Sequence, residues 1–240
     1  MPTVVLWDID GTLIRSNGGR VSVSAFLRAL RQTGDLADDL AYPKNAGGKT
    51  DLQIALELLA AASIADDRAA ELLTRFGAGY LVELQAERAS LTNDLKVLPG
   101  VPEVLARLNE LGVCQSLLTG NLEPIARLKL ACAKLDHYVD FDLGAYGSDN
   151  PDRSCLVPVS RERLKGRFGQ EISPANIVVV GDTPLDIACA RAGGAWVVAV
   201  ATGNFCRADL GMHQPDVLLD DLQDTEAVVK AVFGLAAAVH

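Results

Sequence analysis

Short runs of apolar, mostly β-branched residues alternate along the chain with segments of helical periodicity. The clearest runs cover Thr3–Trp7, Val113–Leu118, Ile177–Val180 and Trp196–Val200, and weaker ones cover Val139–Leu143 and Val217–Leu219. Strands of a parallel sheet are covered on both faces, so they read as continuous apolar stretches, as TVVLW and IVVVG do. The pattern therefore predicts an α/β fold built around a parallel sheet.

The segment between the first two runs offers no strand and has helical periodicity instead. Helices are predicted over Val21–Gln32, over Asp51–Ala62, and from Asp66 to about Ser90 with an interruption near Gly77 and Gly79. An ordinary connection between strands is far shorter, so this segment is an inserted domain. We predict an α/β core domain formed by residues 1–15 and 96–240, and a helical cap domain formed by residues 16–95.

Composition narrows the possible partners. Of 240 residues, 22 are Lys or Arg and 31 are Asp or Glu, so the net charge is −9, which is atypical of a nucleic-acid-binding protein. No apolar run reaches the roughly 18 residues of a membrane span, and the first residues lack the pattern of a secretory signal. We expect a cytoplasmic protein that binds neither nucleic acid nor membrane; its oligomeric state stays open. The 5 cysteines contain no CxxC pair, which argues against a disulfide framework or a zinc site.

Acidic residues gather where predicted strands end. Asp8 and Asp10 follow the first strand in WDIDGT, and Asp182 and Asp186 follow the strand IVVVG in GDTPLD. Ligands of open α/β sheets bind at the carboxyl ends of the strands, so these carboxylates are expected to converge. Several carboxylates without histidine or cysteine favour Mg²⁺, which would also relieve their repulsion. The alternative is that each aspartate only caps a helix or a turn.

A third polar cluster follows the strand VCQSLL. Thr119, Gly120 and Asn121 place a hydroxyl and backbone amides at the same sheet edge, where they could hold phosphoryl oxygens. Asn121 has an equally good structural role as the cap of a helix starting near Leu122. This cluster alone is a weak signal.

Taken in this order, DIDGT, Thr119 and GDTPLD resemble the motifs of the haloacid dehalogenase (HAD) superfamily, within its phosphoglycolate phosphatase-like branch, which has a Rossmann-like core and a helical cap. The resemblance implies that Asp8 is the nucleophile and Asp10 the general acid and base. It implies that Thr119 binds phosphate, that Asp8, Asp182 and the backbone carbonyl of Asp10 hold Mg²⁺, and that Thr12 and Asp186 support them. The implied activity is hydrolysis of a small phosphate monoester through a phosphoaspartate.

The family also requires a basic residue that neutralises the phosphoryl group, and often writes it as a Lys-Pro pair that this chain lacks. Arg153 precedes the apolar run LVPV at a predicted helix entrance, and Arg161, Arg163 and Lys165 lie further along that helix. We favour Arg153, with Arg161 second, because a guanidinium binds two oxygens where an ammonium supplies a point charge. The other reading is that each is a solvated surface residue.

Other functions compete with this interpretation. The segment AGGKTD is similar to a nucleotide-binding phosphate loop, but Pro43 stands where the loop needs glycine and no strand precedes it. Lys49 or Thr50 in this segment could contact the substrate's leaving group; alternatively, Thr50 or Asp51 caps the following helix. A phosphomutase similar to β-phosphoglucomutase has the same core motifs. A non-catalytic module that binds a phosphorylated ligand is a further alternative.

Overall fold

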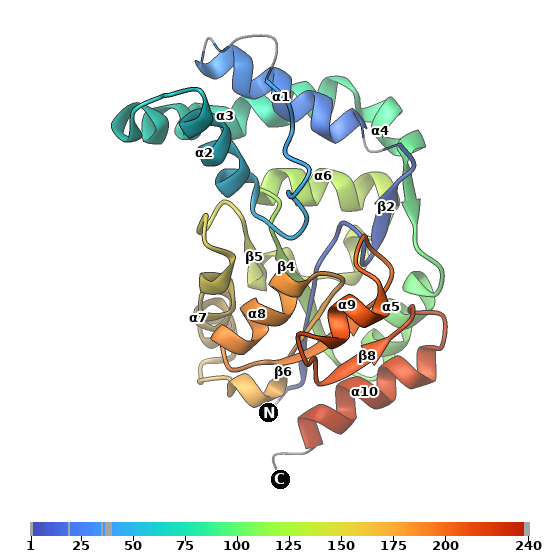
Figure 1. Cartoon of the computed structure of the whole chain (residues 1–240). Helices are drawn as coiled ribbons and strands as arrows, with labels where there is room; N and C mark the ends of the chain where they lie inside the picture. The colour runs from blue at the N-terminus through green and yellow to red at the C-terminus, as the bar shows by residue number, and fades with distance from the viewer. Residues whose placement is uncertain (1, 19, 35, 37–39, 238–240) are drawn as a thin grey trace.

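Six parallel strands form the centre of the molecule in a computed structural model that describes residues 2–18, 20–34, 36 and 40–237. Their spatial order is β5-β4-β1-β6-β7-β8, so β1 lies inside the sheet between β4 and β6. Helices cover both faces, and a helical layer stands over the carboxyl edge of the sheet (Figure 1). The predicted α/β class with a Rossmann-like parallel sheet is confirmed.

The elements follow one another along the chain with these bounds. They are β1 Val4–Trp7, β2 Ile14–Ser16, α1 Arg20–Gly34, α2 Asp51–Ala61, α3 Asp66–Ala86, α4 Arg88–Asp94, β3 Leu95–Val97, α5 Val101–Glu110, β4 Cys114–Thr119, α6 Glu123–Ala133, β5 Ala145–Tyr146, α7 Leu156–Phe168, β6 Ile177–Gly181, α8 Pro184–Ala192, β7 Trp196–Val200, α9 Arg207–Gly211, β8 Val217–Leu219 and α10 Thr225–Ala237. Short 3₁₀ turns also occur, among them η2 at Phe141–Leu143 and η3 at Arg153–Cys155.

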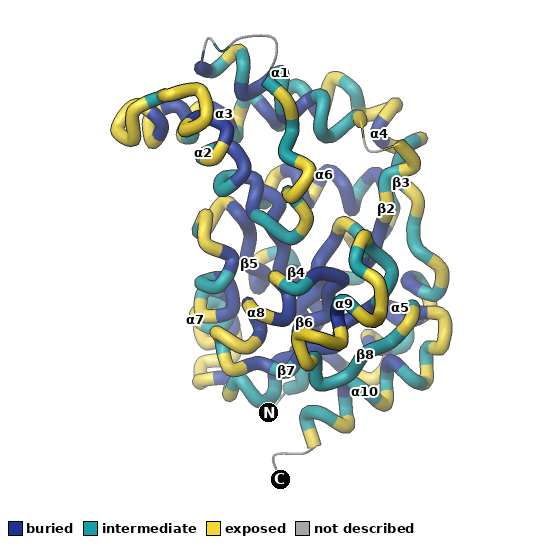
Figure 2. The backbone as a smooth tube through the Cα atoms, in the orientation of Figure 1, coloured by how far each residue is buried: buried dark blue, intermediate teal, exposed yellow. Residues whose placement is uncertain are grey.

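Strand β1 divides its side chains between two hydrophobic cores. Val5 and Trp7 join the core beneath α5 and α10, whereas Val4 and Leu6 join the core beneath α7 and α8. Successive side chains of a strand point to opposite faces, so a strand covered on both sides must be apolar throughout. The tube in Figure 2 is accordingly buried along the central strands.

Helices α1 to α4 form a helical layer, called the cap below, which shares one hydrophobic core with α6. This core contains Phe26, Ile54 and Phe76, and it also includes Ile125 and Leu128 from α6 of the α/β domain. The cap therefore rests on α6 through a continuous apolar contact, and Figure 1 shows α6 directly beneath the cap helices.

Two details of the strand prediction were wrong. Val139–Leu143 is not a strand; η2 occupies its end, because the Asp140 side chain caps the turn at the backbone N–H of Asp142, 3.1 Å away. The edge strand is instead β5, which pairs with Leu118 and Thr119 of β4. The segment expected to lack strands also begins and ends at a short antiparallel pair, β2 with β3, whose three-residue strands leave little pattern in the sequence.

The expected interruption of α3 was also wrong. The helix continues through Gly77 and Gly79 as far as Ala86 and turns at Glu87. A Cβ at Gly77 would lie 3.3 Å from Leu122 of α6, so this glycine permits a close approach of cap and core. Its role is packing and not helix termination.

None of the helices in the described ranges combines the length and the apolar character needed to cross a bilayer.

Candidate active site

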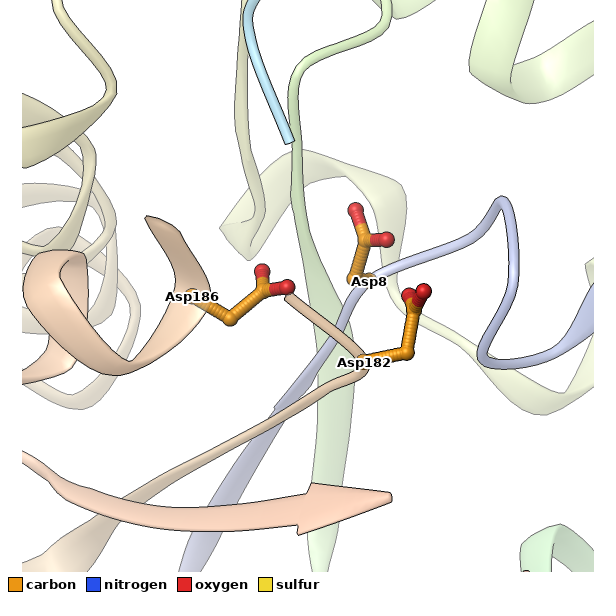
Figure 3. A group of neighbouring side chains, drawn as sticks. All are labelled: Asp8, Asp182 and Asp186. Carbon is orange, nitrogen blue, oxygen red and sulfur yellow. The ribbon is translucent and has the colours of Figure 1, made fainter. Parts of the chain in front are cut away.

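The neighbouring strands β1 and β6 bring three aspartates together. Asp8 follows β1 and Asp182 follows β6, and these strands are paired in parallel, Trp7 opposite Val180. Asp186 reaches the same place from the first turn of α8. One carboxylate oxygen of each lies within 4.8 Å of the others, and all three residues are buried (Figure 3). This donor set of hard oxygen ligands suits Mg²⁺.

Asp182 is held in a narrow space between two turns. Its Oδ1 accepts a hydrogen bond of 3.0 Å from Thr12 Oγ1. A Cβ at Gly11 would lie 2.7 Å from its carboxyl carbon, and a Cβ at Gly203 would lie 2.6 Å from that same atom. Gly11 also has a φ of +93°, which favours glycine. The carboxylate position thus depends on two residues that lack side chains.

The guanidinium of Arg153 lies between Asp8 and Asp186. Its Nη2 donates to Asp8 Oδ1 over 2.9 Å and also to Asp186 Oδ1, while Nη1 donates to the backbone carbonyl of Gly48 in the cap over 2.8 Å. Arg153 is only 5% exposed, and its buried Nε has no hydrogen-bond partner. Asp186 further accepts from the backbone N–H and hydroxyl of Thr183 in a capping box.

The other three basic residues that the sequence offered for the phosphoryl group form ion pairs outside the buried aspartate group. Arg161 and Lys165 form ion pairs with Glu171, and Arg163 forms one with Asp149. Among the four candidates from the sequence, Arg153 is the one bonded to the buried aspartates.

Burial and like charge act together on the acidic group. Burial raises the pKa of Asp8, with further increases from the Asp186 and Asp10 charges, while Arg153 works in the opposite direction. Burial also raises the pKa of Asp182, and the Asp8 and Asp186 charges add to the effect. Asp8 and Asp182 therefore resist being ionised together, and a bound cation would relieve that cost.

The Asp10 side chain points away from this group and lies in a second one. Its Oδ2 accepts hydrogen bonds from Asn121 Nδ2 over 2.8 Å and from Lys129 Nζ over 2.6 Å. Lys129 also donates to Asn121 Oδ1, 2.7 Å away. Of the four aspartates expected to converge, the carboxylates of Asp8, Asp182 and Asp186 do so, whereas the Asp10 carboxylate is not part of their group.

Asn121 has a different role from the helix cap considered above. The N-terminal cap position of α6 is Leu122, and the Asn121 amide donates to Thr119 Oγ1 over 2.9 Å as well as to Asp10. Since Thr119 Oγ1 also accepts from the Asn121 backbone N–H at 3.3 Å, its own hydroxyl proton remains to be donated.

The cap loop before α2 lies directly on this edge of the core. Thr50 is the cap of α2, and its hydroxyl donates to the carbonyl of Pro151 over 2.7 Å; Lys49 pairs with Glu57. Asp51 does not cap the helix; its Oδ2 accepts from the backbone N–H of Leu122 over 2.9 Å. A Cβ at Gly120 would lie 3.0 Å from the carbonyl carbon of Lys49, so this glycine lets the loop approach closely.

A cavity of about 560 Å³ opens between the core and the cap. Its lining includes the predicted site residues Asp8, Asp10, Gly120, Asn121, Thr119, Arg153, Asp182 and Lys49. From the cap, Phe26, Tyr42, Ile54 and Tyr80 complete the wall.

Two buried charged residues at the site, Lys129 and Asp51, were not found from the sequence. Lys129 is 5% exposed and Asp51 8% exposed. The available signal was the placement of Lys129 between Leu128 and Leu130 in a helix, where a charge would face a buried surface. Burial raises the pKa of Asp51 to about 6, although the Lys129 charge lowers it.

Comparison with protein families agrees with this geometry. The sequence profile of the haloacid dehalogenase-like hydrolases matches residues 5–191, which contain both aspartate motifs. This chain belongs to that family. The haloacid dehalogenase-like hydrolase described here is therefore an enzyme, as predicted.

Individual relatives of this haloacid dehalogenase-like hydrolase are phosphatases by name. The chain is 26% identical to "Probable phosphatase IndB" of Dickeya dadantii over 99% of its own length and 98% of that protein. It is 30% identical to a phosphoglycolate phosphatase of Rhodospirillum rubrum over 85% of its own length and 81% of that protein. A crystal structure of β-phosphoglucomutase from Clostridium difficile has a TM-score of 0.66 at 14% identity over 100% of both chains, which shows a shared fold.

Proposed function

We propose that this protein hydrolyses a small phosphate monoester in a Mg²⁺-dependent reaction, with Asp8 as the nucleophile. The observation that carries the proposal is the position of Asp8. It is buried at the end of β1, bonded to Arg153, beside Asp182, and in the lining of the cavity. A nucleophile held by a cation and facing a cavity is what attack on an anionic phosphoryl group requires.

The residues present suit a magnesium ion. The side chains of Asp8 and Asp182 and the backbone carbonyl of Asp10 would hold it, with Thr12 orienting Asp182. Asp186 is engaged by Arg153 and Thr183, so it acts in support. When bound, Mg²⁺ supplies positive charge that offsets the negative charge of the phosphoryl oxygens.

The phosphoryl group is received by donors of this chain. The Thr119 hydroxyl and the backbone amide of Gly120 bind its oxygens, while the Asn121 amides, which donate to Thr119 and Asp10, hold these groups in place. A phosphoryl oxygen would satisfy the buried Nε of Arg153. Because Arg153 engages Asp8 Oδ1, Oδ2 is the oxygen that attacks phosphorus. These contacts align the nucleophile with the phosphorus atom.

The reaction then proceeds in two steps. A bond forms between Asp8 and phosphorus while the bond from phosphorus to the ester oxygen breaks, and Asp10 gives its proton to the departing alcohol. Asp10 next removes a proton from a water molecule whose oxygen attacks phosphorus, while the bond between phosphorus and the Asp8 oxygen breaks. Inorganic phosphate leaves, and the Asp8 carboxylate and the Asp10 proton are restored.

The substrate is proposed at the level of chemical class. A cavity of about 560 Å³ has room for sugar phosphates as well as for a two-carbon phosphate ester, so the phosphoglycolate phosphatase names of relatives do not by themselves select the substrate. Lys49, which lines the cavity, remains a proposed contact of the leaving group from the cap loop. Thr50 is fully buried and its hydroxyl donates to Pro151, so we no longer propose it as a contact. A cytoplasmic location remains a prediction.

The test is an assay of Asp8→Asn with Mg²⁺ and a panel of phosphoglycolate, hexose phosphates and nucleoside monophosphates. We expect phosphate release to fall at least about 10³-fold with unchanged circular dichroism. Asp66→Asn, at the exposed start of α3, is the matched control and should retain full activity. Undiminished release by Asp8→Asn would refute the proposal. An isomerised sugar phosphate without free phosphate would identify a phosphomutase instead.

A further inference from the structure

The ammonium of Lys129 is buried on α6 at the boundary of core and cap. Its side chain is 6% exposed, and its helix neighbours Leu128 and Leu130 are buried. A buried lysine is costly unless its charge is paired and its protons are bonded. Lys129 meets that condition through Asp10 and Asn121. Both of these residues belong to the proposed catalytic site.

The donors of Lys129 and Asn121 converge on one oxygen of Asp10. Lys129 Nζ lies 2.6 Å and Asn121 Nδ2 lies 2.8 Å from Asp10 Oδ2. The Asp10 side chain is nevertheless 46% exposed and lines the cavity, because its other oxygen is left to face the open space. An exposed carboxyl group would otherwise sample several rotamers.

The same bonds connect Asp10 to the proposed phosphate-binding group. Asn121 accepts from Lys129 over 2.7 Å and donates to Thr119 Oγ1 over 2.9 Å. Asp10, Lys129, Asn121 and Thr119 thus form one network across the ends of β1 and β4. The network fixes the distance between the acid–base carboxyl and the phosphoryl site.

A purely structural role for Lys129 is the main competitor. Its charge also acts on Asp51, a buried acid of the cap, so it could serve mainly to balance that charge. The geometry favours the catalytic group, because the hydrogen bonds of the Lys129 ammonium run to Asp10 and Asn121. A purely structural role would affect all substrates alike, whereas a role in positioning Asp10 would affect mainly the step in which the leaving oxygen receives a proton.

We propose that Lys129 is a positioning residue that holds the Asp10 carboxyl in place for proton transfer to the leaving oxygen. This inference rests on the proposed function. Proton transfer requires the acid to lie within hydrogen-bond reach of the leaving oxygen, so a carboxyl fixed by two donors is favoured over one that rotates freely. The contribution is largest when the leaving group needs a proton.

The test compares two esters in Lys129→Met, which keeps an unbranched side chain of similar length but removes the donors. One ester is p-nitrophenyl phosphate, whose phenolate leaves without a proton, and the other is a simple alkyl phosphate, whose alkoxide needs one. The ratio kcat/KM covers the steps up to departure of the alcohol, so hydrolysis of the phosphoaspartate does not enter. We expect a loss of about 10²-fold for the alkyl ester and less than about threefold for the aryl ester.

Three comparisons make the result decisive. Lys165→Met, on the exposed surface of α7, is the control and should leave both ratios unchanged. Lys129→Arg retains a charged donor and should recover part of the alkyl-ester activity. If Lys129→Met does not fold by circular dichroism, Lys129→Gln is assayed in the same way. Equal losses for the two esters, or no loss for either, would overturn the inference.

Failure of this inference is distinguishable from failure of the proposed function. An active Asp8→Asn refutes the proposed function. An inactive Asp8→Asn together with equal effects of Lys129→Met on both esters refutes only the role of Lys129.

Discussion

Replacing Gly203 by alanine tests whether the position of Asp182 controls metal binding. The new Cβ would lie 2.6 Å from the carboxyl carbon of Asp182, whereas ordinary contacts between carbon atoms are about 3.5–4.0 Å. The new Cβ would overlap Asp182 Oδ2 even more closely, so the carboxyl must move by more than about 1 Å. Gly203 has no positive φ, so alanine is compatible with its backbone and the effect is confined to this contact.

The expected magnitude follows from the place of Asp182 among the proposed ligands. Disturbing the group that orients a ligand typically weakens metal binding by about 10- to 100-fold. At a Mg²⁺ concentration of about 100 times the wild-type Kd, the ion adds about 2.7 kcal/mol to the free energy of unfolding. The same concentration should add only about 0.4–1.4 kcal/mol in Gly203→Ala.

The assay is urea unfolding with and without Mg²⁺, supported by titration calorimetry. Gly166→Ala is the matched control, because a Cβ at this position of α7 meets nothing within 4 Å. It should stabilise the protein by up to about 1 kcal/mol and leave the Mg²⁺ increment unchanged. If Gly203→Ala keeps the full wild-type increment, the placement of Asp182 does not govern metal binding and the reasoning is wrong.

Two further substitutions test the charges of the site. Arg153→Met leaves the buried carboxyls of Asp8 and Asp186 without their cation. We expect the free energy of unfolding, measured in urea, to fall by about 3–5 kcal/mol, and inhibition by vanadate to be lost. A fall below about 1 kcal/mol would contradict this expectation. Asp51 has a pKa of about 6 in the folded protein against its usual 3.8, so the folded state binds the proton more tightly and the contribution of Asp51 to stability falls as pH rises through this interval. The free energy of unfolding of Asp51→Asn, relative to wild type, should therefore rise by up to about 3 kcal/mol from about pH 4 to about pH 7; a difference that does not change with pH would contradict the burial of this charge.

The sheet could be predicted from the sequence because each strand is marked by a run of neighbouring apolar residues. Strands β7 and β8 have the predicted bounds, Trp196–Val200 and Val217–Leu219, since a strand covered on both faces must itself be apolar. Strand β5 was missed because two residues at a sheet edge carry too little pattern. Gly77 of α3 misled the prediction, because its reason is a close contact with Leu122 at the start of α6 that no local pattern records.

The candidate site was readable to the extent that it follows from strand ends. Asp8 and Asp182 lie at the ends of paired strands, so their approach follows from the topology. The partner of Asp10 does not, because Lys129 is 119 residues away and lies on a helix. In the sequence, its position between Leu128 and Leu130 indicates burial but does not identify its partner.

The sequence by itself determined the family, the parallel sheet and the acidic motifs at the strand ends, because hydrophobic periodicity and motif spacing are properties of neighbouring residues. Only the tertiary structure decided which charges face one another. It separated the Asp10 carboxylate from the other three aspartates, directed it to Lys129, and placed Arg153 between two acids and a cap carbonyl. The physical reason is that the partner of a buried charge is set by the elements that exclude water from it, and here those elements come from distant parts of the chain.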